Sequence, residues 1–453
     1  MTTIKCFFRN KLGIDKAIAY SSGSRIAQAI TGPLSVLFIA KYLTGVEQGF
    51  FYTFGSLLAV QIFLELGLSG IITQFVAHEA CKLQLHGIEY EGSQEIKSRL
   101  ASLLHFSVKW YGIISVFALC LLILIGYVFF SSYETEGETV DWLIPWVIVC
   151  IATSIKLFQS PIMAFVQGLG LVKEVNKVMF YQQLVLPSIT WIGLALDCKL
   201  YVIGVSSLLS VMVWEVYCQS TKIGCMLKKI WETPINERVS YLGELFPMQW
   251  RIAISWIGGY FTFQLFNPVL FATEGAVVAG RMGMTMTVLN ALQAFTQSWI
   301  NTKVPVLSGL IAQKRYVELD SLFSKTMNQM LGIGVAILFL FLFVIGLIQY
   351  FEWRPFGVDI GNRFLPFIPS LLLSWSIFTM FPINCWATYL RCHKREPLMW
   401  NSIVVACLCC SSTLILGNCY GLYGMVIGFS ILRFISITWV YLVYKKKKYE
   451  WHK

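Results

Sequence analysis

Twelve apolar segments, each long enough to cross a bilayer, most constrain what this chain can fold into. A membrane-spanning helix needs about 20 mostly apolar residues, and only helices or closed barrels satisfy their backbone hydrogen bonds inside lipid. The chain is 57% hydrophobic and 13% charged, whereas soluble domains are about 25% charged. The sequence therefore predicts an all-α polytopic membrane protein. The expected spans are 17–40, 48–77, 101–130, 142–167, 178–196, 200–220, 246–270, 274–300, 326–350, 364–390, 397–417 and 421–444.

Basic residues are concentrated on one side of this arrangement. With both termini in the cytoplasm, 25 of the 35 Lys and Arg residues fall in cytoplasmic segments and four on the opposite side. This bias follows the positive-inside rule, and it accounts for the net charge of +11 without a nucleic-acid partner. The two longest cytoplasmic loops, 80–100 and 221–245, are expected to form short amphipathic interface helices.

Several functional classes lack their motifs in this sequence. No GxxxxGK[ST] motif is present, so ATP-driven transport by this chain alone is not expected. The 13 cysteines show no metal-ligand spacing and are interpreted as small core residues. The sequence therefore predicts no metal, no cofactor and no catalytic residue.

An internal repeat divides the chain into halves. Arg25-Ile26-Ala27 and Arg251-Ile252-Ala253 each open an apolar stretch, and each arginine is followed 24 residues later by a glycine, Gly49 or Gly275. A second correspondence pairs Pro161 and Lys173 with Pro382 and Lys394. Six spans in each half indicate a parallel repeat. We expect about 12 transmembrane helices in two six-helix pseudo-symmetric lobes around a central cavity, with a lobe at 1–220, a cytoplasmic linker at 221–245, and a second lobe with a basic tail at 246–453.

Charged residues inside the spans identify candidate binding residues, because intramembrane charges are expensive and usually functional. An excess of bases over acids predicts a water-filled cationic cavity that binds an anion, and arginine suits phosphate because its planar fork makes bidentate bonds. Each base could instead reach the membrane interface or pair with a buried acid. The bases are Arg25, Lys109, Lys156, Arg251, Arg281 and Arg433, and the acids are Glu65 and Glu215.

Glu65 lies near the middle of the second span. Its carboxyl group is a candidate for proton or cation coupling, or for an ion pair that breaks during a transport cycle. The alternative is a static salt bridge to a neighbouring arginine. For Glu215, which is nearer the cytoplasmic end of its span, we favour a structural pair.

Three short motifs, taken in order with Arg25, give the chain a resemblance to a known family. The motifs are Leu43-Thr44-Gly45-Val46-Glu47-Gln48-Gly49 between the first two spans, Glu65-Leu66-Gly67-Leu68 in the second span, and Gln167-Gly168-Leu169-Gly170 with Lys173 and Asn176 after the fourth. With these residues the chain is similar to the polysaccharide transporter branch of the multidrug/oligosaccharidyl-lipid/polysaccharide exporter superfamily, and most similar to Wzx-like O-antigen flippases. Glu65 stands where that family more commonly has aspartate.

The resemblance implies a substrate and a location. Members of this branch move undecaprenyl-pyrophosphate-linked oligosaccharides across the bacterial inner membrane by alternating access, and an ion gradient is thought to drive the cycle. The product would be O-antigen, capsule or exopolysaccharide. The implied partners are the lipid-linked oligosaccharide, membrane lipids and a polysaccharide polymerase, and the expected state is a monomer. In such a protein the basic residues would hold the substrate and Glu65 would serve ion coupling or gating.

Two other functions stay open at this stage. A multidrug or cation antiporter of the same superfamily would present acidic residues to its substrate. A membrane-embedded enzyme of polysaccharide synthesis, such as a glycosyltransferase or polymerase, would carry a large extramembrane loop with polar catalytic residues, but the longest outer loops here have only about a dozen residues.

Overall fold

The computed structural model describes residues 16–81, 83–86, 89–133, 140–237, 239–241, 246–354, 359–393 and 397–452. Within these ranges the chain is almost entirely helical, and its two short strands form one antiparallel hairpin. The chain packs as two compact units. Unit 1 comprises the described residues of 1–31, 57–134 and 141–257, and unit 2 those of 32–56, 135–140 and 258–453.

Unit 1 is built from helices that pack around α7. The helix α7 contacts α5, α6, α8 and α9 along its length, and its buried face includes Trp146 and Phe165. The elements wholly within unit 1 are η1 (Ala59–Gln61), α4 (Ile62–Glu65), α5 (Leu68–Ala80), β1 (Gln84–His86), β2 (Glu89–Glu91), α6 (Gln94–Ser132), α7 (Leu143–Gly168), α8 (Val172–Ala195), α9 (Tyr201–Ser220) and α10 (Lys222–Trp231).

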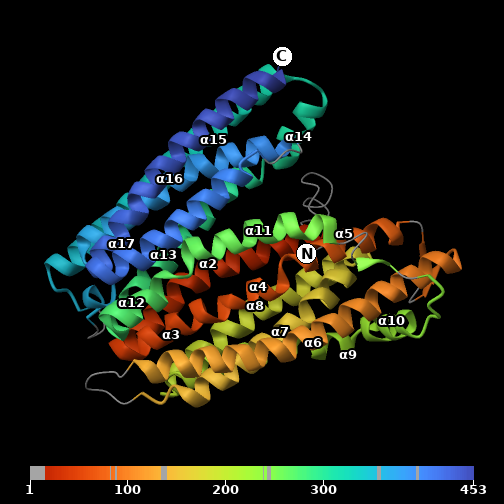
Figure 1. Cartoon of the computed structure of the whole chain (residues 1–453), viewed down its shortest axis with the longest axis horizontal. Helices are drawn as coiled ribbons and strands as arrows, with labels where there is room; N and C mark the ends of the chain where they lie inside the picture. Colours follow the sequence, from red (N-terminus) through yellow and green to blue (C-terminus); the bar gives the residue numbers. More distant parts are fainter. Residues whose placement is uncertain are drawn as a thin grey trace, which may run out of the picture. The chain divides into compact units, whose positions relative to one another are not determined.

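Unit 2 is organised around α16, which packs against α13, α15 and α17. The helix α16 runs alongside both α15 and α17 in the cyan-to-blue part of the chain (Figure 1). The elements wholly within unit 2 are α12 (Phe266–Glu274), α13 (Ala276–Asn301), α14 (Val304–Ala312), α15 (Tyr316–Tyr350), η4 (Gly361–Arg363), α16 (Phe367–Cys392) and α17 (Met399–His452). Three helices pass from one unit into the other, namely α2 (Lys16–Tyr42), α3 (Gly45–Leu58) and α11 (Phe246–Phe263).

The predicted fold class is confirmed. Seven helices of the described residues are long and apolar enough to cross a membrane, or eight if Gly45–Glu65 and Leu68–Ala80 count as one bent span. The twelve predicted spans fit the observed helices, with three differences in continuity. The second span is bent between α4 and α5. The last two spans form the single helix α17, which is interrupted by the left-handed backbone of Gly421. The seventh span is broken between α11 and α12.

The two long connecting segments and the grouping of the chain into units differ in part from the predictions. The interface helix predicted for 80–100 is wrong, because β1 and β2 pair there as a hairpin. A short amphipathic helix is confirmed within 221–245, namely α10, and its place at the membrane interface stays a prediction. The segment 32–56 packs within unit 2 although it is early in the sequence, and residues 246–257 pack within unit 1. The two packed units therefore do not coincide with the two halves of the sequence, because each contains a segment from the other half.

Gly49 shows why segment 32–56 belongs to unit 2. A Cβ atom at this position of α3 would lie 2.0 Å from the backbone oxygen of Ala276. The neighbouring Gln48 side chain is buried and donates hydrogen bonds to the carbonyls of Gly280, at 2.8 Å, and Arg363, at 3.1 Å. Only glycine permits so close an approach of two helices. This contact explains the glycine that ends the motif between the first two spans.

Candidate functional site

Glu65 lies at a break in the second span. The helix α4 ends at Glu65, and α5 begins at Leu68 after a bend of 43°. The two residues between them, Leu66 and Gly67, have left-handed backbones with φ of 47° and 71°. A left-handed backbone costs a residue such as leucine about 1–2 kcal/mol. Such strained positions cluster at functional sites, and broken membrane helices recur at the ion sites of transporters.

Three oxygens form a closed triangle at this break. Glu65 Oε1 accepts hydrogen bonds from Ser69 Oγ at 2.8 Å and from Ser160 Oγ at 3.0 Å. The two serine oxygens are themselves 2.8 Å apart. Ser160 precedes Pro161, which has no N–H and so leaves the carbonyl of Leu157 without its helical partner. The site therefore joins a broken helix to a proline-containing one.

The Glu65 carboxyl group has no basic side chain beside it among the residues that the structure describes. Among the side chains that the structure describes, its polar partners are serine hydroxyls, and no Lys or Arg is within ion-pair distance. The hydroxyl of Tyr111 is buried beside Glu65 and Ser69. The static salt bridge considered from the sequence thus has no support in the described part of the chain.

Arg433 is the most deeply buried of the predicted bases whose side chains are described. It lies on α17 and is only 6% exposed. Its guanidinium carbon is 5.1 Å from the ring centre of Phe263 and 4.9 Å from that of Phe429. Its Nε and Nη2 atoms are buried and have no hydrogen-bond partner among the described residues. The side chain is therefore held by aromatic faces and presents two unused donors.

Two lysines of unit 1 are exposed. Lys109 lies on α6 and Lys156 on α7, and neither pairs with an acid within the ranges that the structure describes. Lys109 adjoins the exposed side chain of Trp110, which fits an anchor at the membrane interface as well as a cavity. Lys156 projects from the helix that also carries Ser160.

The paired arginines of the repeat lie in one unit. Arg25 is on α2 and Arg251 on α11, and both positions fall in unit 1. Their side chains lie outside the described residues. Their role in substrate binding stays a proposal that rests on the sequence.

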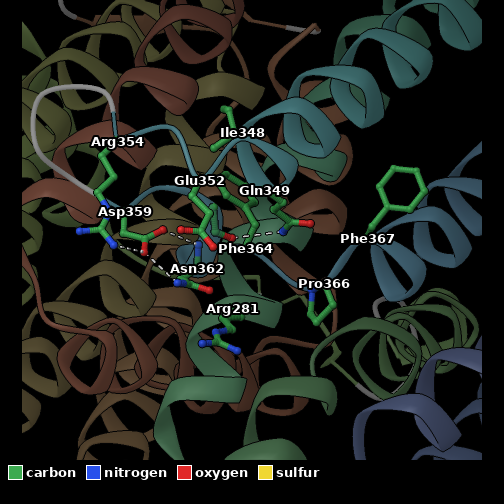
Figure 2. Close-up of a pocket in the computed structure, with 11 residues that line it drawn as sticks. Arg281, Ile348, Gln349, Glu352, Arg354, Asp359, Asn362, Phe364, Pro366 and Phe367 are labelled. Atoms are coloured by element: carbon green, nitrogen blue, oxygen red, sulfur yellow. Dashed lines mark hydrogen bonds and ion pairs between the residues drawn. The ribbon is translucent and has the colours of Figure 1, made fainter.

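Arg281 lines a pocket in unit 2, shown in Figure 2. The pocket has a volume of about 400 Å³, and Arg281 contributes to it from α13. The Nε atom of Arg281 is buried without a hydrogen-bond partner among the described residues. Arg433 does not line this pocket, so these two bases serve different places in the unit.

The side chains that contact Glu65 and Arg433 were not predicted from the sequence. Ser69 stands four residues after Glu65, at helical spacing, and could have been identified from the sequence. Ser160 is 95 residues away from Glu65, and no local pattern indicates their contact. The two phenylalanines beside Arg433 were indistinguishable from the many aromatic residues that pack in membrane helices.

Comparisons with known proteins identify the fold. No protein-family profile and no curated protein matches the sequence. Among solved structures, the chain is similar to an inward-facing multidrug resistance MATE family transporter of the MOP superfamily, with a TM-score of 0.61, 11% identity, and coverage of 93% of this chain and 98% of the other. It is also similar to the lipid II flippase MurJ in an inward closed conformation, with a TM-score of 0.59, 13% identity, and coverage of 94% and 87%.

A third similar structure is a MOP superfamily transporter from Pyrococcus furiosus, described as having a binding pocket of reverse polarity. Its TM-score is 0.51 at 11% identity, and the match covers 95% of each chain. At these identities the similarity shows the fold alone. The chain is a multi-pass membrane protein with the fold of MOP superfamily transporters.

Proposed function

We propose that this chain is a flippase that moves undecaprenyl-pyrophosphate-linked oligosaccharides across the bacterial inner membrane. The transported units would supply O-antigen, capsule or exopolysaccharide, and an ion gradient would drive alternating access. The protein would act as a monomer with both termini in the cytoplasm, in contact with membrane lipids and with a polysaccharide polymerase. The observation that carries this proposal is Arg433, a buried arginine with unused donors and no described acid partner.

Burial of the Arg433 guanidinium is energetically unfavourable unless another interaction compensates for the loss of water. Removing a charge from water costs several kcal/mol unless it is paired, and two nearby phenylalanine faces offset only part of that cost. An anionic substrate group would complete the missing interactions. A pyrophosphate fits the guanidinium because its oxygens accept bidentate hydrogen bonds.

The other bases support the same substrate. Lys156 and Lys109 have no acid partner within the described ranges, so their charges are available to an anion or to lipid headgroups. Arg25 and Arg251 would add positive charge within unit 1. Arg281 would act in its own pocket in unit 2. We propose these residues, together with Arg433, as the substrate-binding set.

Glu65 is proposed as the proton-coupling residue on the basis of its hydrogen bonds. Three oxygen–oxygen contacts of 2.8, 3.0 and 2.8 Å need three protons if each is a hydrogen bond. The hydroxyls of Ser69 and Ser160 supply two, and both are directed to Glu65 Oε1. A proton bound at Glu65 would be donated to one serine, and that serine could then turn its hydroxyl toward the other. Loss of that proton would leave the two serine oxygens in contact without a hydrogen between them. Proton release would therefore loosen the joint between α5 and α7.

A second function, multidrug or cation antiport, is favoured by one observation. An acid without a described base partner, as Glu65 is, could bind an organic cation directly. A membrane-embedded enzyme of polysaccharide synthesis is the remaining alternative. Arg433, which is buried and has no acid partner among the described residues, argues against cation transport, because it would repel such a substrate.

A strain lacking the chain tests the proposal. We expect loss of surface polysaccharide and accumulation of oligosaccharide-pyrophosphate lipid on the cytoplasmic leaflet. If the lipid-linked oligosaccharide is never made, the chain is a synthetic enzyme or its scaffold. If surface polysaccharide and the lipid-linked oligosaccharide are both normal and sensitivity to cationic drugs rises, the function is cation antiport.

Glu65→Gln tests the coupling residue, and Glu215→Gln is its matched control. Glu215 is also an acid within a span, and it accepts a hydrogen bond from Gln159 Nε2 at 3.0 Å, which a glutamine oxygen can still accept. We expect Glu65→Gln to abolish complementation and the pH dependence of transport, while Glu215→Gln retains both. Equal activity of the two variants would remove Glu65 from the mechanism.

A further inference from the structure

The pocket that holds Arg281 lies where α13, the end of α15 and the segment leading to α16 meet (Figure 2). The charge distribution of the sequence predicts that this end of unit 2 is extracytoplasmic. A volume of about 400 Å³ is within the range that small-molecule sites occupy. Its polar lining includes Arg281, Gln349, Glu352, Arg354, Asp359 and Asn362.

Two amide side chains in this lining are fixed by hydrogen bonds that use their donors. Gln349 Nε2 donates to the carbonyls of Gly361, at 3.2 Å, and Leu365, at 2.9 Å. Asn362 Nδ2 donates to Asp359 Oδ2 at 2.8 Å. These bonds set the orientation of each amide and leave Gln349 Oε1 and Asn362 Oδ1 as acceptors. The lining therefore presents fixed acceptors, with Arg281 supplying donors.

The charges of the lining balance. Arg354 lies 3.9 Å from Asp359 in an ion pair, which leaves Arg281 and Glu352 as one cation and one anion. Within the described residues, the Glu352 carboxylate makes no hydrogen bond or ion pair, and the buried Nε of Arg281 makes no hydrogen bond. A balanced site does not favour a pyrophosphate or another polyanion. It favours a ligand that both donates and accepts hydrogen bonds.

Glu352 occupies a position where glycine is the usual residue. It follows Phe351, the C-cap residue of α15, in a Schellman motif in which Trp353 N donates to Ile348 O at 3.1 Å, and its φ is 48°. Glutamate at this left-handed position is less stable than glycine. Its carboxylate lines the pocket, so the strained position places an acceptor at the site.

We propose that this pocket binds one neutral pyranose unit of the transported glycan, an inference that rests on the proposed flippase function for its biological ligand. Sugar hydroxyls donate to Glu352, Gln349 and Asn362 and accept from Arg281. The buried ring of Phe364 contributes apolar surface that suits the C–H face of a pyranose. The pocket holds the glycan head on the predicted outer side while the lipid moves.

Saturation-transfer NMR on the full-length protein in nanodiscs tests this site. The probes are methyl α-glucoside, N-acetylglucosamine, glucuronate and inorganic phosphate. We expect transfer to a neutral pyranose in the wild type and at least about tenfold weaker binding in Glu352→Gly. This variant retains or improves folding, because glycine relieves the left-handed backbone.

Lys314→Gly is the matched control. Lys314 has a φ of 56° after α14 in the same kind of motif, with Arg315 N donating to Leu310 O at 3.0 Å, and it does not line the pocket. We expect it to bind sugar as the wild type does. Absence of neutral-sugar binding in the wild type, binding of glucuronate or phosphate alone, or unchanged binding in Glu352→Gly would overturn the proposal.

The two levels of inference fail separately. If purified protein binds the neutral sugar but the strain lacking the chain has normal polysaccharide and intermediates, the flippase function is wrong and the pocket stands. If the strain accumulates the lipid-linked intermediate but no neutral sugar binds the purified chain, the flippase function stands and the pocket assignment is wrong.

Discussion

Replacement of Arg433 by methionine is expected to stabilise the protein and to abolish transport. Arg433 is 6% exposed, and its Nε and Nη2 donors are unused among the described residues. Methionine retains an unbranched apolar stem that can pack against Phe263 and Phe429. The substitution thus removes the buried charge while leaving most of the packing.

The magnitude follows from the contacts. Each buried, unsatisfied donor costs about 1–3 kcal/mol, so two cost about 2–6 kcal/mol. The two aromatic faces at 5.1 and 4.9 Å return about 0.5–2 kcal/mol each. The balance predicts that Arg433→Met raises the free energy of unfolding by about 1–2 kcal/mol. For a unit of this size, each kcal/mol corresponds to about 2–4 °C in Tm.

Thermal unfolding of the purified variants, followed by tryptophan fluorescence, measures this change beside the complementation assay. Arg363→Met is the matched control, because Arg363 Nη2 donates to the carbonyl of Leu43 at 2.6 Å. Losing that charged hydrogen bond is expected to lower stability by about 1.5–3 kcal/mol. If the Tm of Arg433→Met is below that of the wild type, or if the variant transports fully, then Arg433 is not retained at the expense of stability for substrate binding.

Two further predictions concern packing and pH. Gly49→Ala places a Cβ 2.0 Å from the backbone oxygen of Ala276 and is expected to lower the free energy of unfolding by about 3 kcal/mol. Gly55→Ala on the same helix has nothing within 4 Å of its Cβ and is expected to raise the free energy of unfolding by about 0.5–1 kcal/mol. Equal Tm values for the two variants would contradict this prediction. The pKa of His452 is lowered from its ordinary 6.5, chiefly by burial. Stability from neutral His452 is therefore present above pH 6.5 and lost as pH falls through the lowered folded pKa. Protection factors of the amides in 445–452, which correct for the intrinsic pH dependence of amide exchange, should fall as the pH falls from about 7.5 to 5.5. Unchanged protection would contradict the assignment. The groups that face His452 are Tyr316, Asp320, Tyr389, His393 and Lys448.

The helices and the candidate charges could be predicted because both are local properties of the chain. A run of apolar residues identifies α6 or α15 without reference to any other segment. Glu65 and Arg433 stand out because charges are rare in such runs. The break at Leu66 was not predicted, since a left-handed leucine contradicts local preference and persists only where surrounding contacts enforce it.

A multi-pass helical membrane protein follows from the amino-acid sequence alone, because backbone groups in lipid must bond within their own helix and each span can be recognised from its own residues. Only the tertiary structure decided that segment 32–56 packs within unit 2, that Ser160 meets Glu65, and that Gln349 and Asn362 share a pocket with Arg281. These contacts join segments distant in the chain. Hydropathy, which sets where spans occur, is insensitive to which faces of those spans meet.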